Sequence, residues 1–115
     1  MKEIKYIPEP CDGSIFKGHV VIKKASMDDV LECNEIVEKL KDSPTSQGRS
    51  MVEWSKKFYV SVDIKSIDGT EYKSFDDLKA DAECVEVLFD IAAALSQGVN
   101  KKKLMAQTPK VGQKL

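Results

Sequence analysis

Histidine and paired cysteines, the side chains most often found in metal sites, are scarce in this sequence. Its 115 residues contain a single histidine, His19, and three widely spaced cysteines, Cys11, Cys33 and Cys84. No two cysteines form a C-x-x-C pair, so a structural zinc site lacks its ligands. The odd number favours three reduced thiols in a cytoplasmic protein. We expect Cys33 and Cys84 on apolar helix faces and Cys11 in a loop, where its thiol could reach solvent.

Long apolar runs and phosphate-binding glycine motifs are also missing. No stretch approaches the ~18 apolar residues of a membrane-spanning helix, and the N-terminus has no apolar signal core. The glycine–serine clusters at residues 12–14 and 48–50 match neither a P-loop nor a nucleophile elbow. The sequence therefore predicts no membrane contact, no cofactor and no small-molecule substrate, and a cytoplasmic location.

Neither sign of charge is in clear excess. Eighteen basic and nineteen acidic residues leave a net charge of -1, which argues against a general nucleic-acid-binding protein. The positive charge is nevertheless concentrated near the end of the chain. Residues 100–115 contain no acidic side chain and five lysines: Lys101, Lys102, Lys103, Lys110 and Lys114. We predict a single domain over residues 1–99 and a flexible basic tail over residues 100–115.

The hydrophobic pattern predicts an α+β fold. Residues 2–7 and 14–24 are typical of two strands that pair as an antiparallel hairpin, the second with Phe16, Val20 and Ile22 on one face. A further strand is expected over residues 59–66, with Val60 on its buried face. Asp68-Gly69 is a hairpin turn that leads to a return strand over residues 70–73.

Three main helices and one short helix are expected to cover this small sheet or pair of hairpins. Ser26 begins the first, whose apolar stripe starts at Met27. Residues 42–48 look like a polar linker, and a second helix follows over residues 49–57. A short helix spans residues 75–79, and Asp81 caps the last. That last helix ends at Gly98, and its predicted buried stripe is Cys84, Val85, Leu88, Ile91, Ala92 and Leu95.

Few side chains suggest catalysis. His19 has no identifiable nucleophile or carboxylate partner, and an activity based on it or on Cys11 is a minor hypothesis. The carboxylate pairs at residues 28–29 and 76–77 each fall in the first turn of a predicted helix, where capping explains them. We therefore predict a protein that is not an enzyme.

One aromatic cluster offers a second candidate surface. Trp54, Phe58 and Tyr59 lie beside Lys56 and Lys57, a combination that can bind single-stranded nucleic acid. We favour a core position for Trp54 and Phe58, with Tyr59 and the lysines at its rim.

The arrangement of these elements resembles that of phage tail assembly chaperones. A strand that ends in basic residues, 20–24, leads into the capped acidic helix over residues 26–40. A strand, a turn and the stretch Ser74-Phe75-Asp76-Asp77-Leu78 follow, and the closing helix precedes a polar tail. The resemblance covers roughly residues 14–100.

The resemblance implies a non-enzymatic chaperone that binds a long helical tape-measure-type protein while the tail is built. Self-association through the Ala92–Ala94 face and the Cys33 stripe would also fit. The alternative is a small regulator or inhibitor that blocks the surface of a larger enzyme. The candidate partner-binding residues are Lys101, Lys102, Lys103, Trp54 and Tyr59.

Overall fold

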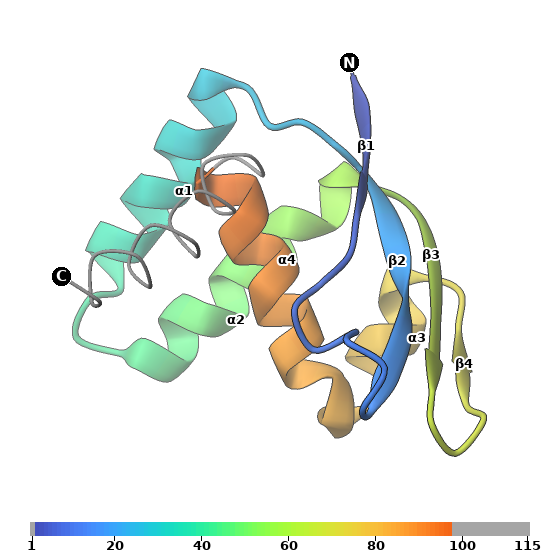
Figure 1. Cartoon of the computed structure of the whole chain (residues 1–115). Helices are drawn as coiled ribbons and strands as arrows, with labels where there is room; N and C mark the ends of the chain where they lie inside the picture. The colour runs from blue at the N-terminus through green and yellow to red at the C-terminus, as the bar shows by residue number, and fades with distance from the viewer. Residues whose placement is uncertain (1, 98–115) are drawn as a thin grey trace, which may run out of the picture.

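The chain folds as a four-stranded sheet with its helices gathered on one face, as the computed structural model shows for residues 2–97 (Figure 1). The strands are β1 (Glu3–Tyr6), β2 (Phe16–Lys23), β3 (Tyr59–Ser66) and β4 (Glu71–Tyr72). The α-helices are α1 (Met27–Lys39), α2 (Pro44–Ser55), α3 (Phe75–Lys79) and α4 (Val85–Gln97). Two single 3₁₀ turns, η1 (Lys56–Phe58) and η2 (Ala82–Cys84), precede β3 and α4. The predicted α+β fold is confirmed.

The strands follow chain order, β1-β2-β3-β4, and every neighbouring pair is antiparallel. The two expected hairpins are therefore halves of one sheet. Val20 lies opposite Tyr6 on one side and Val62 on the other, and all three are buried. Alternation thus places the apolar face of each strand toward the helices, as the sequence predicts.

A bulge in β3 corrects the prediction for Val60. Val21 pairs with Ser61 but Ile22 pairs with Tyr59, so Val60 is the extra residue between them. An extra residue reverses the alternation on one side of the bulge. Val60 is consequently 43% exposed, whereas Val62 and Ile64 are buried as expected.

The first two helices show one confirmed start and two corrections. Ser26 and Asp29 form the predicted capping box of α1. Met27, expected on the buried stripe, is 76% exposed because it occupies the first position of the helix. Most of the predicted linker 42–48 is helical, since Pro44 sits in the first turn of α2 and needs no hydrogen-bond donor there. The side-chain amide of Gln47 also donates to the Val37 carbonyl at the end of α1 (2.8 Å).

The last helix begins in a different phase from the predicted one. Asp81 caps the 3₁₀ turn η2, where its carboxylate accepts from the Glu83 amide (2.9 Å). The tighter turn rotates the first residues of α4 relative to a continuous α-helix. Val85 is therefore 43% exposed and Val87 is fully buried, although the other predicted stripe residues of α4 lie in the core. The predicted helix end at Gly98 lies outside the described residues.

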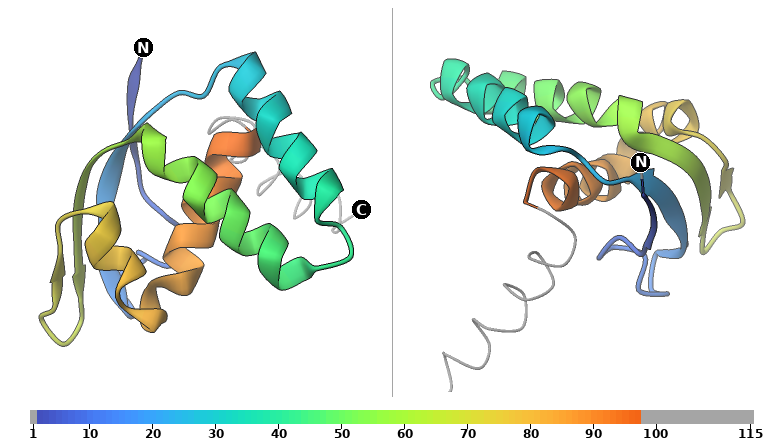
Figure 2. Two further views of the ribbon diagram at one scale, coloured as in Figure 1. Left: turned by 180° about the vertical axis from the view of Figure 1, so that it is seen from behind. Right: turned by 90° about the horizontal axis from the view of Figure 1, so that it is seen from above.

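The helices form a layer against the sheet. Figure 2 shows α1 and α2 together, with α4 beneath them and beside β1. The core that they enclose includes Cys33 from α1, Val52 and Trp54 from α2, and Leu78 from α3. Within residues 2–97, no helix has the length and apolar character required to cross a lipid bilayer.

We expect Gly18→Ala to destabilise the fold more than Gly13→Ala. Both glycines have positive φ, +134° and +96°, which costs an alanine about 1–2 kcal/mol. A methyl group at Gly13 would meet nothing within 4 Å, but at Gly18 it would overlap the Asp63 carbonyl oxygen and lie 2.8 Å from Ile64 Cα. Urea unfolding should show about 1–3 kcal/mol of additional loss for Gly18→Ala. Equal losses would contradict this register of β2 and β3.

We expect Asp29→Asn to reduce the loss of stability in acid. Hydrogen bonds from the backbone and side chain of Ser26 hold the pKa of Asp29 below its ordinary 3.8. The stabilisation is therefore present above about pH 4 and is lost as the pH falls through the lowered pKa. The difference in unfolding free energy between pH 7 and pH 3 should be smaller in this variant than in the wild type. Asp28→Asn is the control because Asp28 does not take part in the capping box, and identical pH profiles for the two variants would contradict the assignment.

Candidate functional site

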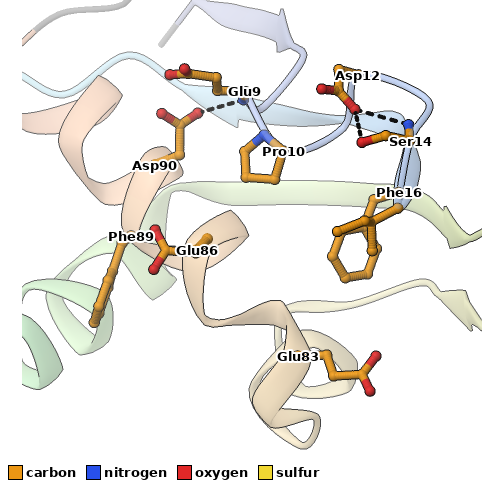
Figure 3. A pocket seen from close by; sticks show the side chains of 10 residues that line it. Glu9, Pro10, Asp12, Ser14, Phe16, Glu83, Glu86, Phe89 and Asp90 are labelled. Atoms are coloured by element: carbon orange, nitrogen blue, oxygen red, sulfur yellow. Dashed lines mark hydrogen bonds between the residues drawn. The ribbon is translucent and has the colours of Figure 1, made fainter.

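A groove lies between the β1–β2 loop and the beginning of α4 (Figure 3). Its volume is about 790 Å³. We call it the acidic groove because five carboxylates and no lysine or arginine line it, together with apolar side chains. Its lining residues are Glu9, Pro10, Asp12, Ser14, Ile15, Phe16, Glu83, Glu86, Phe89 and Asp90.

The loop wall of the groove is fixed by local hydrogen bonds. The Cys11 amide donates to the Pro8 carbonyl (2.9 Å), and the Gly13 amide donates to the Phe16 carbonyl (2.9 Å). Asp12 Oδ1 accepts from the Ser14 amide (2.9 Å) and hydroxyl (2.6 Å). Because these bonds favour the charged carboxylate, the side chain and then the backbone of Ser14 lower the pKa of Asp12.

Cys11 anchors this loop, which corrects the expectation that its thiol could reach solvent. Only 6% of its surface is exposed, and it belongs to the hydrophobic core. Burial, reinforced by the negative charge of Asp90, raises the pKa of the Cys11 thiol to about 11. The thiol is therefore protonated at neutral pH, which makes it a poor nucleophile.

Asp90 joins the loop wall to the helix wall. Its Oδ2 atom accepts hydrogen bonds from the Tyr6 hydroxyl (2.6 Å) and from the Glu9 amide (2.9 Å). Burial, together with the hydrogen bond to Asp90, raises the pKa of the Tyr6 phenol well above its usual range. The phenol therefore remains a donor at every physiological pH, and the loop is held against α4.

Phe89 provides an aromatic side chain on the helix wall. It is 43% exposed, and its ring lies across α2 at Gly48, where an added Cβ would come within 3.2 Å of the ring. Because Gly48 has no side chain, it leaves room for the Phe89 ring on the surface of α2. Glu86 lies three residues before Phe89 and Asp90 one residue after it, and Figure 3 shows Asp90 beside the loop at Glu9.

Sequence reasoning did not identify these residues. The one signal in the sequence was an aromatic residue, Phe89, that falls off the buried stripe of a helix, between the acidic positions 83, 86 and 90. The loop residues gave no comparable signal, because only the folded chain brings residues 9–16 beside α4.

The aromatic cluster is mainly a core feature. Trp54 is 6% and Phe58 2% exposed, and their ring centroids lie 5.0 Å apart, which confirms the favoured core position. Tyr59 packs edge-on against Phe75 (5.0 Å). Burial raises the pKa of its phenol, with Ser55 opposing part of the rise. Lys57 binds Glu32 (2.8 Å) at the rim. The partner-binding roles of Trp54 and Tyr59 stay predictions.

The structure also bears on the remaining sequence candidates. Lys101, Lys102 and Lys103 lie outside the described residues. Ala92, Ala94 and Cys33 are at most 1% exposed, so the face expected to mediate self-association already packs within the fold. Self-association itself stays a prediction, and it would have to use another surface.

The carboxylate pairs act as capping residues only in part. Asp29 and Asp77 accept hydrogen bonds from the backbone just before their helices, from Ser26 and Lys73, and the Asp77 amide donates to Ser74 Oγ (3.1 Å). Asp76 instead lies 3.7 Å from Lys56. Within residues 2–97, histidine, cysteine and acidic side chains form no group that could hold a metal ion.

Comparisons with known proteins add no family. No protein-family model matches the chain, and neither the curated proteins nor the solved structures give a match to it. The chaperone resemblance therefore remains a prediction.

We expect Tyr6→Phe to destabilise the protein by about 1.5–3 kcal/mol, as is usual when a hydrogen bond to a charged group is lost. It should also accelerate hydrogen exchange at the Glu9 amide, because the loop loses one of its two bonds to Asp90. Tyr72→Phe is the matched control, since Tyr72 donates an equally short hydrogen bond to a different carboxylate, Asp81 (2.6 Å). If both variants affect Glu9 exchange equally, the Tyr6–Asp90 bond does not hold the loop.

Proposed function

We propose that this protein is a non-enzymatic assembly chaperone that binds a long helical protein of the tape-measure type during phage tail assembly. The proposal places it in the cytoplasm of the host cell. The observation that carries it is the acidic groove, which is lined by apolar side chains together with five carboxylates.

The chemistry of the groove suits an amphipathic segment that carries lysine or arginine. Pro10, Ile15 and Phe89 supply apolar surface for its apolar side chains. Helices are commonly recognised in apolar grooves through residues at i, i+3, i+4 and i+7. The carboxylates supply charge for its basic side chains, which improves specificity and the rate of association more than affinity.

The size of the groove agrees with this occupant. A cylinder 10 Å wide and two helical turns long has a volume of roughly 850 Å³, close to the 790 Å³ of the groove. The groove therefore accommodates about two turns of a helix, and not a whole long helix. A chaperone with such a site would cover one short apolar segment of a long partner at a time and keep it from aggregating.

The sequence resemblance supports the specific form of the proposal. Strand β2 leads into the capped acidic helix α1, and β3, its turn and β4 lead into α3 over residues 75–79. These are the elements on which the resemblance to tail assembly chaperones depends. A gene neighbourhood with a tube protein upstream and a very long helical protein downstream would supply the partner for the experiment.

We expect the double variant Ile15→Thr/Glu86→Gln to weaken binding of that neighbouring long helical protein about tenfold. The change removes apolar contact and one rim charge, together worth about 1–2 kcal/mol. The measurement is the dissociation constant from calorimetry, with the soluble fraction of the co-expressed partner as a second readout.

The matched control is Val60→Thr/Glu35→Gln, which removes one exposed apolar side chain and one exposed carboxylate outside the groove. It should bind as the wild type does. Equal affinity of the two double variants would contradict the groove as the site. A wild-type protein that neither binds nor solubilises the long helical protein would contradict the chaperone function, and tight binding to a larger enzyme instead would favour the regulator.

A further inference from the structure

Positive and negative charge are segregated along this chain. All nineteen acidic residues fall within residues 1–99, which hold thirteen basic residues and therefore carry a formal charge of -6. Residues 100–115 carry five lysines and no acidic residue, a formal charge of +5. The net charge of -1 is therefore the sum of an acidic part, residues 1–99, and a basic part, residues 100–115.

Two carboxylates of the acidic groove, Glu83 and Glu86, stand outside the ion pairs of the described residues. The ion pairs that fix Lys41, Lys56, Lys57, Lys73 and Lys79 all lie elsewhere. Glu83 and Glu86 take part in none of them. Their carboxylates line a cavity that also exposes Phe89 and Ile15. A ligand with lysines next to apolar side chains would complement both features.

We propose that residues 100–115 of the same chain occupy the acidic groove and compete there with the protein partner. Lys101, Lys102 and Lys103 would run back beside α4, with Lys102 and Lys103 near Glu86, and Leu104 and Met105 would cover the apolar side chains. The inference rests on the proposed function only in naming the partner that is displaced. The docking itself depends on the groove and on the charge of the two parts.

Chain length permits this return. Glu86 lies eleven residues before Gln97, so the two are roughly 16 Å apart along α4 at 1.5 Å per residue. Lys101 to Lys103 follow Gln97 by four to six residues, which span up to about 13–21 Å when extended. Lys102 and Lys103 can therefore run back beside the helix as far as Glu86, and the residues after them can reach the level of Glu83.

Tethering makes the competition effective. A segment linked this closely to its site has an effective concentration on the order of millimolar, so even weak docking occupies the groove. A partner present at micromolar concentration must bind correspondingly more tightly to displace it. The segment would thus prevent the groove from capturing unrelated basic peptides while leaving it open to the proper partner.

The test compares amide NMR spectra of the full chain with those of the variant Lys101→Gln/Lys102→Gln/Lys103→Gln. We expect chemical-shift changes at Glu83, Glu86 and Phe89 that do not depend on protein concentration. The matched control, Lys2→Gln/Lys5→Gln/Lys23→Gln, removes the same charge from exposed positions in and just before β1 and in β2, outside the groove, and should leave these resonances unchanged. Unchanged groove resonances in the tail variant would overturn the proposal.

A synthetic peptide of residues 100–115 supplies an independent readout. It should bind the triple tail variant at least tenfold more tightly than the wild-type chain, whose groove is already occupied. Adding Glu83→Gln/Glu86→Gln to the tail variant should weaken the peptide threefold to tenfold, and raised salt should do the same. Equal peptide affinity for the wild type and the tail variant would overturn the proposal. Shifts that disappear on dilution would assign the groove to the segment of a second copy and overturn docking within one chain.

The two proposals fail separately. In one case the groove variant binds the long helical partner more weakly, but substitution of the tail lysines leaves the groove resonances unchanged. That result would support the chaperone function and overturn the proposal that residues 100–115 dock in the groove. In the other case the groove resonances change when the tail lysines are substituted, but the groove variant binds the long helical partner as the wild type does. That result would support docking of residues 100–115 and overturn the groove as the site of the chaperone function.

Discussion

One oxygen of Asp90 connects the beginning of this fold to its last helix, because it accepts hydrogen bonds from both the Tyr6 hydroxyl and the Glu9 amide. The partners are separated by 84 and 81 residues in the chain. This contact fixes how the two walls of the candidate site lie against each other. It holds the β1–β2 loop against α4, and the space left between the two is the acidic groove. A site fixed in this way loses little conformational entropy on binding, which favours affinity.

The same arrangement determines what the groove can recognise. Four of its carboxylates, Glu9, Asp12, Glu83 and Glu86, are exposed, whereas Phe16 is buried and Phe89 lies partly exposed on the helix wall. A basic amphipathic segment would complement both the carboxylates and the apolar side chains of the groove. The proposed protein partner and residues 100–115 share this chemistry. Because both would bind the same surface, they would compete for it. The buried, protonated thiol of Cys11 contributes packing to the loop, not reactivity.

Local signals predicted much of the fold, and long-range contacts account for what they missed. The bounds of β3 and the starts of α1 and α3 followed from alternation and capping, which act within a few residues. The start of α2 at Pro44 was hidden because a polar first turn resembles a linker. Val60 was misplaced by a bulge that depends on pairing with β2. The groove was out of reach because its two walls, residues 9–16 and 83–90, meet only through tertiary structure.

Hydrogen–deuterium exchange of the full chain, with and without the proposed long helical partner, tests the central claim most directly. Recognition through the acidic groove predicts that binding slows amide exchange in residues 9–16 and 83–90. The exposed end of α1 near Met27 and the β3–β4 turn would be unaffected. Protection confined to α1 or to β3 and β4, with unchanged exchange along both walls of the groove, would contradict the account.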